Sequence, residues 1–321
     1  MKRRAFIAII GLAAASPLHS YAQTAGANRR IGFLHPTTAA PDSPTLKLLR
    51  PVWQSLGYSE PESVLLRSAD SDPSRLPTLA RELVELGAGV LIAVGPAAVR
   101  AASSIGAPVV AIDLETDPIR AGLIASFSRP GGNVTGLFLD QPSLAGKWLD
   151  LLKEAAPKVK RVALVWNPAT PPDQLETAQQ VAGARGIPTL TFEVRSPDGY
   201  DPQFQELAGG PESGVIQLGT PGFSVGAKQF AAAALRYRLP TVTHQSFFAV
   251  DGALMSYGPA RGGFFSRAVL LADKVLKGEK PGEIPIERPS QFEFVVNLKT
   301  ARALGLALSP TLLAQADEVI E

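Results

Sequence analysis

Residues 161–168 read RVALVWNP, and residues 30–36 read RIGFLHP. Each stretch is a short apolar run that ends in a polar residue and a proline. Each also opens a series in which such runs alternate with amphipathic helical stretches. The runs begin at 31, 63, 90 and 109 in the first series, and at 161, 189, 214 and 241 in the second. This alternation predicts parallel strands with helices on both faces, so the restart at 161 predicts two doubly wound α/β lobes.

The end of the chain departs from strict alternation. The sequence predicts a short strand and turn over 253–259, an extended proline-rich segment over 280–290 and a strand over 292–297. Amphipathic patterns predict helices over 45–56, 74–86, 96–104, 117–127, 173–185, 201–208, 226–238, 261–278 and 298–304.

Residues 129–140 read RPGGNVTGLFLD and lie where the first series ends. A phosphate-binding loop would lie between a strand and a helix, whereas this stretch follows a predicted helix and precedes a strand. Asn133-Val134-Thr135 is a formal glycosylation sequon, which also arises by chance. Glycines permit backbone torsions that other residues resist, so we interpret the stretch as a connecting strand and hinge between the lobes.

The N-terminus has the pattern of a secretory signal peptide. A basic MKRR precedes eleven apolar residues, and the small residues Ser20 and Ala22 predict cleavage before Gln23. The Arg3-Arg4 pair leaves both general secretion and the twin-arginine route open. Removal of residues 1–22 leaves 28 basic and 29 acidic residues, a formal charge of −1. The basic balance of the full chain is therefore no evidence for a nucleic-acid partner.

The sequence favours binding over catalysis. Gly222-Phe-Ser224-Val-Gly226 matches a G-x-S-x-G nucleophile elbow, but Thr220-Pro221 separate it from its strand. No acid lies between Ser224 and His244, so the order of a hydrolase triad is absent, and a serine hydrolase remains the less favoured alternative. The chain has no cysteine and, beyond residue 22, only two histidines. We expect no metal, no cofactor and no catalytic residue.

Several stretches resemble the exported substrate-binding proteins of ABC importers, in particular the tryptophan/tyrosine type. They are DPIRAGLIASFSRPGGNVTG (117–136), LDLLKEAAPKVKRVALVWNP (149–168), LMSYGP (254–259), LADKVLKGEKPGEIPIERPSQFEFVVNLKTARALGL (271–306) and ADEVIE (316–321). The resemblance implies the type I periplasmic-binding-protein fold, with two lobes, three crossovers and a ligand cleft. Phe138 stands where many members have serine, so the chain looks like a subgroup.

This fold class places the N-terminal lobe at 29–138 plus 257–287, and the C-terminal lobe at 139–256 plus 288–321. The implied function is capture of a small molecule, an amino acid or related zwitterion, for a membrane permease and its ATPase. The implied setting is the periplasm, with the protein acting as a monomer. A ligand sensor of the same fold is the alternative from another class.

Open α/β sheets bind ligands beyond the C-terminal ends of their strands. Hydroxyls and helix-start amides suit a carboxylate, and acids suit an ammonium group. On this basis the candidate ligand-binding residues are Thr37, Gly95, Pro96, Asp113, Thr116, Asp117, Asp140, Asn167, Thr220, Gln245 and Tyr257. Asp117, which precedes Pro118, also suits a helix N-cap, and Asp140 suits either the ligand or a cap of a helix near Pro142.

Overall fold

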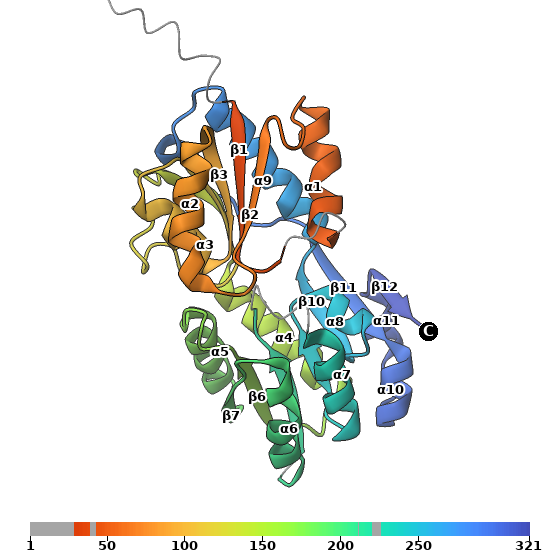
Figure 1. Ribbon diagram of the computed structural model, residues 1–321. Coiled ribbons are helices and arrows are strands. Elements are labelled where there is room, and N and C mark those ends of the chain that lie inside the picture. Colours follow the sequence, from red (N-terminus) through yellow and green to blue (C-terminus); the bar gives the residue numbers. More distant parts are fainter. Residues whose placement is uncertain (1–28, 39–42, 211, 220–225) are drawn as a thin grey trace, which may run out of the picture.

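The computed structural model describes residues 29–38, 43–210, 212–219 and 226–321. Two α/β lobes, each built on one twisted sheet, lie end to end (Figure 1). The expected fold class, two doubly wound lobes with largely parallel sheets, is confirmed.

The first lobe contains a five-stranded parallel sheet in the order β2-β1-β3-β4-β5. Helices α1 and α9 pack together on one face, and α2 and α3 cover the other. Ile31 and Phe33 of β1 pack in the first core and Leu34 in the second, so side chains of one strand are buried on both faces. The elements are β1 (Arg30–His35), α1 (Pro44–Ser55), β2 (Val64–Ser68), a 3-10 turn (Pro73–Arg75), α2 (Leu76–Glu85), β3 (Ala88–Val94), α3 (Pro96–Ser104), β4 (Val109–Asp113), β5 (Val134–Phe138), α9 (Arg261–Leu276) and a 3-10 turn (Pro281–Glu283).

The second lobe contains a seven-stranded sheet in the order β12-β11-β10-β9-β8-β6-β7. All neighbouring pairs are parallel except β10 and β11. Its elements are α4 (Gln141–Ala155), β6 (Arg161–Trp166), α5 (Asp173–Ala184), β7 (Thr189–Glu193), a 3-10 turn (Pro197–Gly199), α6 (Tyr200–Ala208), β8 (Ser213–Gln217), α7 (Ala227–Arg236), β9 (Thr241–Thr243), α8 (Ser246–Val250), β10 (Met255–Pro259), β11 (Phe292–Asn297), α10 (Leu298–Leu304), α11 (Pro310–Ala314) and β12 (Glu318–Ile320).

The chain passes between the lobes three times. It leaves the first sheet after β5, returns between β10 and α9, and leaves again between the bridge from Leu137 to Glu287 and the start of β11. Strand β10 stays paired in the second sheet as far as Pro259, so the boundary proposed at residue 257 falls inside this strand.

The helix expected over 117–127 is wrong. This segment forms turns, because the Asp117 side chain accepts the amides of Ile119 and Arg120 and Gly122 takes a positive φ of 68°. The segment instead folds back on itself, with the Ala125 amide donating to the carbonyl of Pro130 at 2.9 Å. It projects from the first lobe as a loop that reaches the second.

The position of Gly136 on β5 explains why the 129–140 stretch has a glycine there. Its φ is 134°, and a Cβ there would lie 2.1 Å from the carbonyl oxygen of Ala111 on β4. Only glycine fits this close approach. Gly136 also accepts the amide of Glu287 at 2.9 Å, which ties β5 to the third crossover.

Candidate functional site

A cavity lies between the lobes, where the C-terminal ends of strands from both sheets face each other. Its volume is about 100 Å³. The first lobe contributes the ends of β1, β3 and β4 and the start of α1, the second contributes the start of α8, and α9 closes one side. The lining residues are His35, Thr45, Val94, Gly95, Ile112, Leu114, Glu115, His244, Gln245, Phe247, Arg261, Phe264 and Phe265.

Larger grooves lie elsewhere, including one of about 470 Å³ at the base of the second lobe. That groove is lined from one lobe only, by segments that include residues 155–159 and 304–307. The cavity between the lobes is the better candidate because it lies at the strand ends where open α/β sheets bind ligands. We call it the interlobe cavity.

Arg261 is the cationic group of the interlobe cavity. It is the first residue of α9, directly after the second crossover, and its Nη2 donates to Thr45 Oγ1 at 2.9 Å. Its guanidinium carbon lies 5.7 Å from the ring centre of Phe247 and 5.8 Å from that of Phe265. Burial lowers the pKa of Arg261, although an arginine stays charged at any physiological pH.

Glu115 is the acidic group of the same cavity, and it is 5% exposed. Burial raises the pKa of Glu115 to about 8, and the charge of nearby Asp113 adds to the shift. Burial also raises the pKa of Asp113 to about 6, against the opposing effect of Thr116 and two backbone amides. Glu115 therefore holds a proton at neutral pH, and a ligand cation beside it would favour release of that proton.

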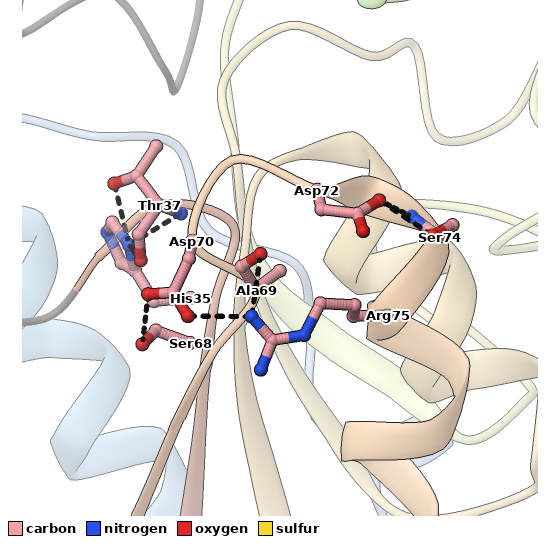
Figure 2. Close-up of polar contacts among 8 residues, drawn as sticks. All are labelled: His35, Thr37, Ser68, Ala69, Asp70, Asp72, Ser74 and Arg75. Atoms are coloured by element: carbon pink, nitrogen blue, oxygen red, sulfur yellow. Dashed lines mark hydrogen bonds and ion pairs between the residues drawn. The ribbon is translucent and has the colours of Figure 1, made fainter.

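Two histidines complete the polar lining. Burial lowers the pKa of His244 to about 3, with a further contribution from the charge of Arg261, so its ring is neutral. Its Nδ1 is buried and has no hydrogen-bond partner among the described residues. The His35 ring sits at the end of β1, where Figure 2 shows its Nδ1 in contact with the backbone and hydroxyl of Thr37. Burial lowers the pKa of His35 as well.

Two contacts between the lobes lie beside the cavity. Arg120, in the loop that follows β4, forms ion pairs with Asp173 at 3.3 Å and Glu176 at 3.0 Å on α5. A Cβ at Gly219 of the second lobe would lie 3.2 Å from Glu115 Oε1, so the Glu115 carboxyl reaches across to the second lobe. The segment from 114 to 120 therefore both lines the cavity and contacts the second lobe.

Of the residues expected to bind ligand, the structure brings Gly95 and Gln245 together in the interlobe cavity. Gly95 precedes α3 with a φ of 79°, and Gln245 precedes α8 and is 8% exposed. Pro96 follows Gly95 but lines a groove at the rim between the lobes. Thr37 lies beside the cavity, through its contacts with His35.

Asp113, Thr116 and Asp117 flank Glu115. The Oδ1 of Asp113 accepts the amides of Glu115 and Thr116, at 3.2 and 3.0 Å. Asp113 is fully buried and Thr116 is 2% exposed, and neither lines the cavity. Asp117 caps a turn rather than a helix, as described above.

Asp140 and Tyr257 lie together at the hinge, away from the interlobe cavity. Both line a separate cavity of about 290 Å³. Asp140 pairs with Arg288 at 3.1 Å, and Tyr257 stacks on Phe292 with ring centres 5.6 Å apart. Asp140 occupies the N-cap position of α4, but its side chain makes no capping hydrogen bond.

Asn167 also lies outside the interlobe cavity. Its Oδ1 accepts the amide of Ala169 at 2.9 Å, within the turn that follows β6. Thr220 and the G-x-S-x-G serine Ser224 lie outside the described residues, as do residues 1–22 of the expected signal peptide.

Sequence reasoning missed Arg261. A cation at the first position of a helix opposes the helix dipole, and this unfavourable placement was the available signal. Glu115 was also missed as a residue, although it lies inside the loop from 113 to 117 that strand ends had indicated.

Neither a metal centre nor a membrane helix is found in the described part of the chain. No group of three or more His, Cys, Asp or Glu side chains in these ranges could hold a metal ion. No helix there combines the length and hydropathy that crossing a bilayer requires.

The fold and the shared cavity define a two-lobed protein that encloses a small ligand between its lobes. Residues 50–320 match the family described as ABC transporter substrate binding protein, and the chain belongs to this family. It is thus a substrate-binding protein of an ABC transporter. The family is one of binding proteins rather than enzymes, and its members typically act outside the cytoplasm.

Relatives support this placement. A tyrosine-binding protein of Clostridioides difficile (strain R20291) is 23% identical over 256 residues, which cover 78% of this chain and 73% of that protein. An ABC domain from Streptococcus pneumonia, solved in complex with L-Trp, superposes with a TM-score of 0.79 at 23% identity, over 91% of this chain and 100% of that one. A conserved domain protein from Vibrio cholerae gives a TM-score of 0.79 at 20% identity, over 91% and 99% of the two chains.

Proposed function

We propose that this protein is the exported solute-binding component of an ABC importer, and that it captures an amino acid or a related zwitterion. The observation that carries the proposal is one cavity, enclosed by both lobes, that contains a half-buried cation, Arg261, and a buried acid, Glu115. A cation together with an acid that would ionise beside a ligand cation suits a small ligand with a carboxylate and an ammonium group. The names of two relatives, a tyrosine-binding protein and a domain complexed with L-Trp, support the same ligand class.

Capture requires the lobes to move. The cavity of about 100 Å³ is smaller than the roughly 300–1,000 Å³ of typical ligand sites, so an amino acid must enter with the lobes apart. The three crossovers supply the hinge, as in other domain closures around ligands. A protein that closes in this way presents a different surface to the permease when it is loaded.

Export to the periplasm and action as a monomer complete the proposal. The basic, apolar and small-residue pattern of residues 1–22 supports export. Cell fractionation of the full chain, with Arg3→Lys and Arg4→Lys together, separates the twin-arginine route from general secretion. Retention of wild type in the cytoplasm would contradict export.

A thermal-shift screen tests the ligand class. Purified protein lacking residues 1–22 is screened against the twenty amino acids, small organic acids and nucleosides, and hits are measured by calorimetry. We expect an amino acid to raise the melting temperature and to compact the protein in small-angle scattering. Binding by nucleosides or sugars alone would refute the amino-acid assignment.

A further inference from the structure

Arg261 is a half-buried cation whose guanidinium lines the interlobe cavity. Among the described residues no carboxylate lies within ion-pair distance of its guanidinium, and Thr45 Oγ1 accepts from one of its five N–H donors. Arg267, two turns along the same helix, forms a two-pronged pair with Glu287 at 2.5 and 2.7 Å. Partial burial of a charge without a partner is unfavourable, so an anion beside Arg261 would stabilise this site.

The groups around Arg261 are suited to an anion. Thr45 lies at the start of α1 and Gly95 at the start of α3, and both line the cavity, so two helix N-termini meet there. His244 is 5% exposed, lines the same cavity and has an Nδ1 without a partner in the described ranges. A neutral imidazole can donate from this nitrogen.

Apolar side chains make up about half of the cavity lining, and several of them lie near Arg261. The rings of Phe247 and Phe265 flank the guanidinium, and Phe264 and Leu114 extend the apolar lining. A flat cation held between aromatic rings keeps its N–H groups directed outward at its edge, where a carboxylate binds in a forked geometry. A ligand with a carboxylate at one end and an apolar body beside it fits this arrangement.

Resting on the proposed function, we propose that Arg261, Thr45 and His244 form the subsite that binds the ligand's carboxylate, and that this carboxylate is the main determinant of ligand selection. Arg261 supplies a forked pair of N–H donors, His244 Nδ1 supplies a third donor, and Thr45 orients the guanidinium. The ammonium group then binds Glu115, which lines the same cavity. Phe247 comes from the second lobe, so carboxylate binding at Arg261 occurs where both lobes meet.

The test compares three matched ligand sets by calorimetry. The first set is L-tyrosine and L-tryptophan. The second lacks the ammonium group, as 3-(4-hydroxyphenyl)propionate and indole-3-propionate. The third lacks the carboxylate, as tyramine and tryptamine. Wild type is expected to bind the first two sets more tightly than the third.

Arg261→Gln is expected to weaken binding of the carboxylates by about 10- to 100-fold, the scale of a charge-assisted hydrogen bond, and to abolish the preference over the amines. Arg261→Lys keeps the charge without the fork, so an intermediate loss is expected. Arg81→Gln, the same change at an exposed position on α2, should leave all affinities unchanged. The melting temperature of unliganded Arg261→Gln should equal or exceed that of wild type, because the variant removes an unpaired charge.

The outcomes separate the two proposals. If the acids bind but the amino acids do not, the amino-acid function fails and the carboxylate subsite stands. If the amino acids bind Arg261→Gln within twofold of wild type, the subsite is wrong and the function stands. Wild type that binds the amines as tightly as the acids, or binds no carboxylate at all, would also overturn the subsite. A markedly lower melting temperature of unliganded Arg261→Gln would show a structural role instead and overturn it too.

Discussion

Replacing Gly258 with alanine should damage both stability and ligand binding. Gly258 lies on β10 at the second crossover, and a Cβ there would lie 1.8 Å from the carbonyl oxygen of His244 and 2.9 Å from its carbonyl carbon. Real Cβ atoms essentially never approach within 3.0 Å, so the two backbones must separate by about 1.2 Å. Neither neighbour is a flexible side chain, so rotamer changes cannot relieve the overlap.

The size of the effect follows from what this separation would disturb. Overpacking in a well-packed interior typically costs about 1–3 kcal/mol of stability, and backbone displacement places Gly258→Ala at the upper end of that range. His244 and Gln245 both line the interlobe cavity, so the same displacement moves two ligand-binding candidates. We therefore expect a lower melting temperature and at least about tenfold weaker binding, since misplacement by 1 Å is costly at a site.

Gly262→Ala is the matched control. Gly262 lies four residues further on, inside α9, and the nearest atom to a Cβ there is Leu48 Cδ2 at 3.9 Å. Gly262 lies in the first turn of the helix, where the gain of about 0.5–1 kcal/mol for alanine over glycine in a helix interior is an upper limit, so this variant should be at least as stable as wild type. Urea unfolding and calorimetry on both variants measure the difference. Equal stability of the two variants, or unchanged affinity in Gly258→Ala, would refute the reasoning.

Three further predictions concern charged groups. The pKa of Glu115 is raised from about 4.5 to about 8 in the folded protein, so between these pH values the folded state holds a proton that the unfolded state has released. The stability of wild type therefore falls as pH rises towards 8, and Glu115→Gln should gain stability relative to wild type between pH 5 and pH 9. If the melting temperatures of the two proteins change in parallel with pH, this prediction is contradicted. Arg120→Gln breaks the ion pairs between the loop after β4 and α5, so ligand affinity should fall at most a few-fold, with a smaller effect in high salt, and a salt-independent effect would argue against the pairing. If Asp140 binds the ligand, Asp140→Asn should lose about 1.5–3 kcal/mol of binding free energy at constant stability. If Asp140 only pairs with Arg288 at the surface, the variant should lose less than about 1 kcal/mol of stability at constant affinity. The position of Asp140 at the hinge favours the second result, and calorimetry decides between them.

The fold could be predicted because its signals are local. Strands such as β1 and β6 are continuous apolar runs buried on both faces, and helices such as α3 and α10 begin and end where the pattern indicated. The failure at 117–127 has a physical cause as well. Asp117 and Gly122 satisfy the backbone within turns, and such short-range side-chain competition outweighs a helical pattern of apolar residues.

The site was less predictable because it is assembled from distant segments. The rule that ligands bind at strand ends identified Gly95 and Gln245, since Gly95 directly follows β3 and Gln245 lies two residues beyond β9. Arg261 belongs to a helix that follows β10 of the second sheet and packs on the first sheet. Its place in the cavity depends on a crossover, and no local pattern specifies which side chains a crossover brings to the cleft. Asp140 and Tyr257 were assigned from the same crossovers and lie together at the hinge instead.

For the proposed closure of the lobes, the position of Arg261 would supply an electrostatic contribution. The guanidinium is held to the first lobe through Thr45 and lies against Phe247 of the second, so both lobes contribute to its surroundings. In an open form, water would solvate the guanidinium and lower the free-energy cost of its burial. In a closed form without an anion, the guanidinium would lose this solvation with no ionic partner to offset the loss. A bound carboxylate offsets the cost only in the closed state, because the attraction between the charges strengthens as water is excluded. Under the proposed carboxylate subsite, the ligand would therefore stabilise the closed form selectively, and an equally tight ligand without an anionic group would lack this part of the driving force for closure.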